Sequence, residues 1–282
     1  MSDGACLSDR VPLQRARGVL TLGVARREGG GTALARLRQE GCLKARLPAI
    51  ERGADLTAVL VNSSGGIASG DRLDSVIEAG PGASLTVTSQ AAERVYRAEP
   101  GGPPAEVRTR IEVGAGARVE WLPQETILFN AARLNRALHV TLAEDAVFVG
   151  LECLLLGRAA MGERVHSGSL RDLIHIERAG EPILHDPIRI EGAISEQLAS
   201  RATAGGAVAI ATLVLVAPDA ATRLAALREA LAGSGAEAGA SCWNKLLLAR
   251  IIATDGATAR AAILAALPIL RGERPIPRVW NC

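Results

Sequence analysis

Apolar and polar residues alternate in short runs along the first two thirds of the chain, the pattern of half-buried β-strands. Glycine, proline, asparagine and aspartate punctuate these runs, as expected for turns between strands. One unit recurs: IEAGPGASLTV at 77–87, IEVGAGARVEW at 111–121 and, more weakly, VTLAEDAVFVG at 140–150. Each copy has the pattern of a strand, a four-residue turn and a second strand. We therefore predict a mostly β fold of stacked-strand, β-helix-like layers; a meander of hairpins that reuses one kind of turn is the alternative.

The last third of the chain changes to strands followed by helices. Residues 208–216 are a continuous apolar run that predicts a buried strand, and residues 220–231 carry apolar side chains at helical spacing. Residues 243–253 repeat the strand pattern, and a second predicted helix runs from 255 to about 270. Two successive strand–helix units place both helices on one face of a sheet.

These patterns divide the chain into three parts. We expect a flexible N-terminal tail, a layered β domain, and a β-α-β-α C-terminal part packed on that domain: residues 1–16, 17–204 and 205–282. With 282 residues, 48% of them hydrophobic, the chain can bury a large core. Aromatic residues make up only 2% of the chain, so Leu, Val, Ile and Ala must build that core.

Charge and cysteine usage exclude several classes of protein. The net charge is +2, without a basic stripe, so nucleic-acid binding is not expected. We also expect no secretory signal and no membrane segment, because no apolar run is long enough. The five cysteines lie far apart without a CxxC pair, which argues against disulfides or structural zinc and favours a cytoplasmic protein.

The stretch VNSSGGIASGDRLD at 61–74 is the most unusual loop in the sequence. It lacks the lysine of a phosphate-binding loop, and the residues after it alternate like a strand instead of opening a helix. Gly65, Gly66 and Gly70 therefore predict a tight connection between strands, where backbones approach closely. Asp71 at its end either caps the turn through backbone N–H groups or serves a polar site.

Catalytic patterns are sparse, but several acids stand in apolar surroundings. Glu125, Glu152 and Asp172 interrupt otherwise hydrophobic runs, and buried carboxylates require partners. Arg158 and Arg171 are candidate partners. Such acids either form ion pairs in a layered core or line a hydrated path that holds a divalent cation weakly through oxygen atoms. The four histidines have no metal-binding spacing, and surface exposure is expected for His175 and His185.

Six motifs, in this order, resemble the urease accessory proteins of the UreD family, also called UreH. They are NSSGGIASGD, LTVTSQAAERVYR, RVEWLPQETILFN, LLLGRAAMGE, GSLRDL and the terminal PRVWNC. The resemblance extends from about Arg17 to the C-terminus. One departure is Ser69, where the family usually has glycine before Gly-Asp.

The resemblance implies a scaffold that is not an enzyme. Members of the family bind apo-urease and, through UreF, the GTPase UreG, and they help to deliver nickel to the urease active site. It further implies a hetero-oligomer with UreF and UreG, no tightly bound cofactor, and nickel that passes transiently through a water-filled interior channel.

The resemblance places Asp71 as a channel-lining position. To it we add, from their pattern alone, further candidate channel and metal positions: Glu125, Glu152, Asp172, Thr86, Thr88 and Arg158. The alternative function is a β-solenoid hydrolase that uses a carboxylate pair such as Asp71 and Glu125. The scarcity of aromatic side chains for sugar stacking disfavours it.

Overall fold

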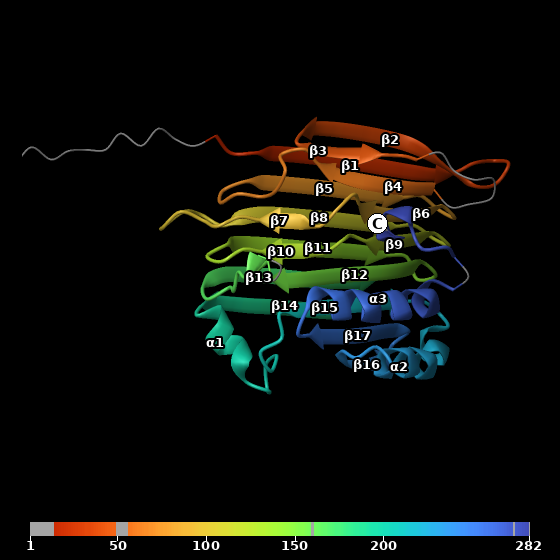
Figure 1. The fold of residues 1–282 in the computed structure, drawn as a ribbon. Coiled ribbons are helices and arrows are strands. Elements are labelled where there is room, and N and C mark those ends of the chain that lie inside the picture. The colour runs from red at the N-terminus through yellow and green to blue at the C-terminus, as the bar shows by residue number, and fades with distance from the viewer. Residues whose placement is uncertain (1–13, 49–55, 159–160, 273, 282) are drawn as a thin grey trace, which may run out of the picture.

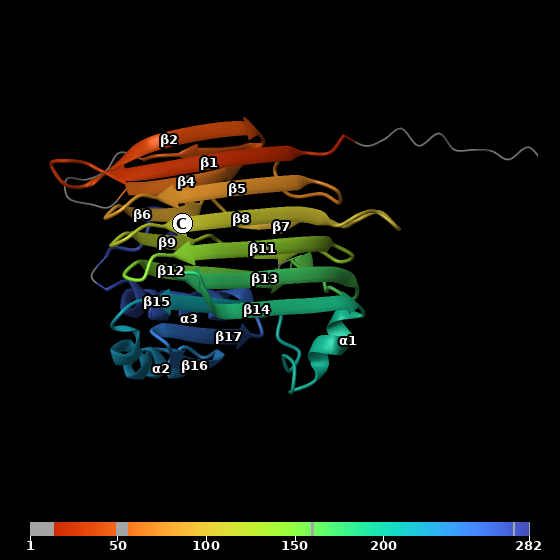
Figure 2. The ribbon, with the colours of Figure 1, turned by 180° about the vertical axis from the view of Figure 1, so that it is seen from behind.

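The chain winds between two β-sheets, and through its middle part the longer strands fall alternately in one sheet and the other (Figures 1 and 2). The structure, a computed structural model, describes residues 14–48, 56–158, 161–272 and 274–281. Sheet A contains, in spatial order, β14 (Glu181–Gly192), β13 (Gly168–Arg178), β11 (Arg133–Leu142), β8 (Ala105–Val113), β5 (Arg72–Ala79), β1 (Arg17–Arg26) and β2 (Thr32–Gly41). Sheet B contains β16 (Glu237–Trp243), β17 (Leu246–Ala253), β15 (Ala209–Val216), β12 (Val147–Leu156), β9 (Arg118–Leu122), β6 (Ser84–Ser89), β4 (Leu56–Asn62) and β3 (Leu43–Arg46), with the short β7 (Glu93–Val95) and β10 (Thr126–Leu128) beside this path.

Each turn of this winding lies on the previous one, because equivalent strands pair in parallel. β5, β8 and β11 are parallel neighbours in sheet A, and β6, β9 and β12 are parallel neighbours in sheet B. The turns of the three sequence repeats also stack: Gly114 N donates to Ala79 O at 2.8 Å, and Ala143 N donates to Val113 O at 2.9 Å. The predicted stacked-strand fold is confirmed, and a meander of hairpins is excluded because its neighbours would be antiparallel.

Antiparallel strands close both ends of the parallel region. β2 pairs with β1 at one end, and β14 pairs with β13 at the other. In sheet B, β15, β17 and β16 continue the sheet in antiparallel order. The strand predicted at 243–253 is confirmed as β17 but begins later, at Leu246: Trp243 ends β16, and Asn244 and Lys245 form a turn with φ of 45° and 62° before β17.

The two predicted C-terminal helices cover the outer face of sheet B (Figure 1). They are α2 (Leu224–Ala232), preceded by a 3₁₀ turn at Ala220–Arg223, and α3 (Gly256–Arg271). Asp255 caps α3, accepting a hydrogen bond from Thr258 N at 2.8 Å. A short helix, α1 (Ile194–Ala199), and a 3₁₀ turn at Arg278–Asn281 complete the described elements.

The helices on sheet B explain why some strands alternate between apolar and polar residues while others are continuously apolar. In the part of the chain that the structure describes, no helix covers the outer face of sheet A (Figure 2), and its strands alternate between apolar and polar residues. Strands of sheet B such as β12 and β15 are buried on both faces and are continuously apolar. The predicted N-terminal tail lies mostly outside the described residues.

Candidate functional site

A row of polar side chains crosses the space between the two sheets. We call it the interior polar belt, and it consists of Ser75, Thr109, Arg136, Asp172 and Asp186 from sheet A, and Glu152, Thr212 and Arg250 from sheet B. Strand register pairs some members directly: Ser75 is opposite Thr109, Arg136 is opposite Asp172, and Thr212 is opposite both Glu152 and Arg250. Between Thr109 and Arg136, and between Asp172 and Asp186, the belt shifts by one inward position. Because the belt passes from strand to strand, it runs along the stacking axis of the fold.

The belt separates two apolar clusters. On β11, Leu134 belongs to one cluster and Leu138 to the other, with Arg136 between them at the same inward-facing phase. The same order of apolar, polar and apolar inward positions occurs on β5, β8, β13 and β15. Burying polar and charged side chains costs free energy unless they are paired with one another or hydrated.

The centre of the belt is an ion-paired triad of Arg136, Glu152 and Asp172. The Arg136 guanidinium donates from Nε to Asp172 Oδ1 at 2.8 Å and from Nη2 to Oδ2 at 2.6 Å. Its Nη1 lies 2.6 Å from Glu152 Oε2, so one arginine connects sheet A to sheet B. Trp121 Nε1 donates to Glu152 Oε1 at 2.8 Å, and all four carboxylate oxygens therefore have a partner.

Burial and the nearby opposite charges shift the pKa values of Glu152 and Arg136 in opposite directions. Burial raises the pKa of Glu152, and the attraction of Arg136 offsets this only in part while Asp172 adds repulsion. Burial disfavours the charged form of Arg136, but Asp172 and Glu152 outweigh it, so the pKa of Arg136 rises. The triad thus combines a permanent cation with two carboxylates, one of which is reluctant to ionise.

A cavity of about 300 Å³ lies beside the triad. Ser75, Thr109, Trp121, Arg136 and Glu152 contribute to its lining, so half of the belt faces open space. A cavity of this size, with polar groups set among largely apolar walls, has room for several water molecules.

A further carboxylate, Glu93, lines the same cavity. Asn62 Nδ2 donates to Glu93 Oε2 at 3.1 Å, and burial raises the pKa of Glu93. Carboxylates with raised pKa values around one cavity mark a candidate functional site. Beyond the triad, the belt continues through Thr212 to the ion pair between Arg250 and Asp186. Like the triad, this ion pair joins sheet A to sheet B.

The glycine loop connects sheet B to sheet A, between β4 and β5, as a tight strand connection. Asp71 is buried, and its carboxylate oxygens accept hydrogen bonds from Ala16 N and Ala68 N, both at 2.7 Å. This side chain therefore fastens the loop and the segment before β1. Gly66 has no room for a side chain, because a Cβ would lie 2.4 Å from the Tyr96 ring.

Three of the candidate positions lie on the opposite side of sheet B from the cavity. Glu125 pairs with Arg260 of α3 at 3.0 Å, and Thr86 donates to Glu120 at 3.1 Å beneath the end of α3. Thr88 is buried on the same face as Thr86. Of the sequence candidates, the structure brings together only Glu152 and Asp172. Asp71 and Glu125, the pair of the hydrolase alternative, have no partner in common.

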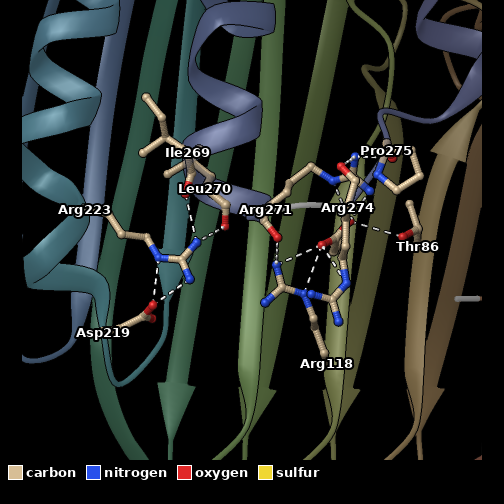
Figure 3. A network of polar contacts seen from close by, with 10 residues as sticks. Thr86, Arg118, Asp219, Arg223, Ile269, Leu270, Arg271, Arg274 and Pro275 are labelled. Carbon is tan, nitrogen blue, oxygen red and sulfur yellow. Dashed lines mark hydrogen bonds and ion pairs between the residues drawn. The ribbon is translucent and has the colours of Figure 1, made fainter. Parts of the chain in front are cut away.

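Figure 3 shows the arginine cluster on that outer face of sheet B. Glu120 is 1% exposed, and Arg271, at the end of α3, contacts its Oε2 at 2.6 Å. Arg118 donates to its Oε1 at 2.9 Å, and Arg274 approaches at 3.9 Å. This cluster fastens the end of α3 and the following segment to β9 and is remote from the cavity side of the sheet.

The arginine partners expected for the buried acids were wrong. Arg158 pairs with Glu163 at 2.8 Å and lies over the Phe129 ring at 4.1 Å, and Arg171 is exposed. The partner is Arg136, which the sequence analysis missed. Its signal was present: Arg136 stands in phase with Leu134, Leu138 and Val140, so its side chain had to point inward.

No preformed metal centre accompanies the belt. Among the residues described, no group of three or more His, Cys, Asp or Glu side chains is placed to hold a metal ion. Cys42 and Cys153 are buried and free, and burial raises the pKa of Cys153 to about 12, which keeps that thiol protonated. No helix in the described ranges is long and apolar enough to cross a bilayer.

Fold and site together define a class: a two-sheet solenoid with a polar layer through its core and helices on one face. Residues 16–281 match the family described as UreD urease accessory protein. Similar proteins named urease accessory protein UreD come from Methylobacterium sp. (strain 4-46), 45% identical over 95% of both chains, and from Rhizobium rhizogenes (strain K84), 45% identical over 98% of both chains. The chain belongs to the UreD family of urease accessory proteins.

Proposed function

We propose that the chain is a non-catalytic cytoplasmic scaffold of urease maturation, and that nickel ions cross its interior along the polar belt on their way to apo-urease. In this proposal it binds apo-urease and, through UreF, the GTPase UreG. The names of its relatives support a role in urease maturation. Nickel is the cargo here and not a resident cofactor.

The observation that carries the nickel path is the alignment of the belt with the stacking axis beside an open cavity. The belt itself extends from β5 to β14 in sheet A, and in this proposal the path continues along the same axis to surfaces at opposite ends of the solenoid, as a conduit between two docked partners requires. Oxygen ligands suit such a task, because thiolates would retain a borderline metal such as nickel more firmly.

The triad limits how tightly a cation can bind along this path. Every carboxylate oxygen of Glu152 and Asp172 already has a donor, so an entering cation must compete with Arg136 and Trp121 for them. That competition weakens cation binding and favours release. The permanent charge of Arg136 also repels a cation that stays near it.

The test replaces the charges of the triad while preserving its size, with the variant Arg136→Met, Glu152→Gln, Asp172→Asn. Removing all three charges avoids the cost of an unpaired buried ion, so the fold is expected to survive. We expect normal co-purification with apo-urease, UreF and UreG but a several-fold drop in the nickel content and activity of urease.

The matched control is Arg158→Met with Glu163→Gln, an ion pair away from the belt. It should activate urease like the wild type. Normal nickel loading by the triad variant would refute the interior path while leaving the scaffold role intact. Loss of partner binding in a folded triad variant would show that the belt serves assembly instead.

A further inference from the structure

Three of the four histidines form a row on the exposed face of sheet A. His139 on β11, His175 on β13 and His185 on β14 are direct register partners. Each points away from the core, because it alternates with buried neighbours such as Leu138 and Ile174. The row is separate from the interior polar belt, which faces the other side of the same strands.

Two imidazole nitrogens in this row face each other closely. His185 Nδ1 lies 3.2 Å from His175 Nδ1, and the ring centroids are 5.3 Å apart. Two nitrogen ligands of one metal ion, each about 2.1 Å from it, are separated by about 3.0–3.4 Å in octahedral or tetrahedral geometry. The separation in the protein therefore matches that of a ligand pair.

A carboxylate orients the central histidine. His175 Nε2 lies 3.0 Å from Glu177 Oε1. An ionised carboxylate only accepts hydrogen bonds, so Nε2 carries the proton and Nδ1 presents its lone pair to His185. A carboxylate bound to the far nitrogen is the arrangement that supports metal-binding histidines in proteins.

A surface hollow of about 200 Å³ lies beside His175, on the side of His139. It is lined by His139, His175, Glu177, Arg110 and Glu112, and His185 does not contribute to its lining. The His139 ring centroid is 5.7 Å from that of His175, and burial with the nearby His175 and Arg110 lowers the pKa of His139. His139 is thus a neutral imidazole next to the pair, although it does not converge with the pair on one point.

We propose that His175 and His185 form a surface site for a divalent transition-metal ion that favours imidazole, such as Zn²⁺, Ni²⁺ or Cu²⁺. Glu177 positions His175, and water completes the coordination. With two protein ligands, the site binds its ion exchangeably. It does not depend on the interior path and stands even if the triad variant loads urease normally.

The test titrates Zn²⁺ and Ni²⁺ into the tag-free full-length chain and measures stoichiometry by equilibrium dialysis. We expect His175→Ala and His185→Ala each to lose one bound ion. His166→Ala, which removes the histidine outside the row, should keep it. Glu177→Gln should weaken binding by about 10–100-fold, as loss of a supporting carboxylate does elsewhere.

A second measurement identifies the ligands directly. Electron paramagnetic resonance of the Cu²⁺-loaded chain should show coupling to two imidazole nitrogens, and this coupling should disappear in His185→Gln. Unchanged stoichiometry in both alanine variants would overturn the proposal and leave the pair as a hydrogen bond between two imidazole rings. Circular dichroism of each variant confirms that the exposed substitutions leave the fold unchanged.

Discussion

At the residue scale, one inward-pointing arginine organises the interior of this protein. Arg136 makes three contacts of 2.6 to 2.8 Å with two carboxylates on different sheets. An arrangement of this kind contributes little net stability relative to apolar packing, because all three ions lose hydration. We infer that the triad is retained for function and for the geometry of the belt.

The raised pKa of Glu152 predicts a pH dependence of stability. Its folded pKa lies above the ordinary value of 4.5. The protonated side chain therefore contributes stability that is present below the unfolded pKa and is lost as pH rises through the folded pKa. The free energy of unfolding of wild type minus that of Glu152→Gln should fall as pH increases from 4 to 8.

Urea denaturation across that pH range measures this difference. Glu93, whose pKa is also raised, is present in both proteins, so its contribution cancels. A difference that grows with pH would mean that Arg136 stabilises the Glu152 carboxylate by more than burial costs.

Site prediction from sequence succeeded only in part at this scale. Glu152 and Asp172 were found because a charge inside an apolar run is a local signal. Arg136 could have been found from its phase in β11. Its pairing with Glu152 could not, because contact between residues on two sheets depends on how the layers stack. Thr86 and Glu125 face α3, which strand alternation alone cannot reveal when both faces of a sheet are buried.

At the element scale, the repeats and the C-terminal helices were predictable because their signals are local. Two-residue periodicity, four-residue turns and the Asp255 cap each lie within a short window. β16 was missed because its sequence, EAGASCW, is rich in small residues, and its turn uses Asn244 and Lys245 without glycine. That turn chemistry gives a weak hairpin signal.

The Glu120 cluster should be essential for holding α3. Glu120→Ala leaves Arg271, which is 3% exposed, as an unpaired buried charge, and we expect a loss of about 3–5 kcal/mol in the free energy of unfolding. Glu144→Ala, which removes a carboxylate paired at the surface with Lys245, should cost about 0–1 kcal/mol. Thermal and urea unfolding measure both, and similar losses would contradict a special role for the cluster.

The glycine loop yields a second prediction about an element. Gly66→Ala combines a positive φ of 148° with a Cβ placed 2.4 Å from Tyr96, so it must displace that ring. We expect a cost of about 1–3 kcal/mol from the overpacking alone. Gly65→Ala, with a positive φ but no heavy atom within 4 Å, carries only the backbone strain of about 1–2 kcal/mol. Equal losses in urea denaturation would show that the Tyr96 contact is unimportant.

At the scale of the whole molecule, the polar belt is the feature that an all-apolar solenoid core would lack. A core stacked from Leu, Val and Ile could close the same space without desolvating ions. Instead, several strands in both sheets replace an inward apolar residue with a polar one, at the same or an adjacent position of the register. In our account, these positions form the nickel path.

The most direct test closes that path without altering its charge. Thr109→Leu places an apolar side chain in the cavity, while Thr141→Leu makes the same change at an exposed position on β11. Nickel bound to urease after maturation with each variant, at equal amounts of assembled complex, is the quantity to measure. A nickel path along the belt predicts a several-fold nickel deficit for Thr109→Leu and wild-type nickel for Thr141→Leu. Equal nickel loading by both variants would contradict it.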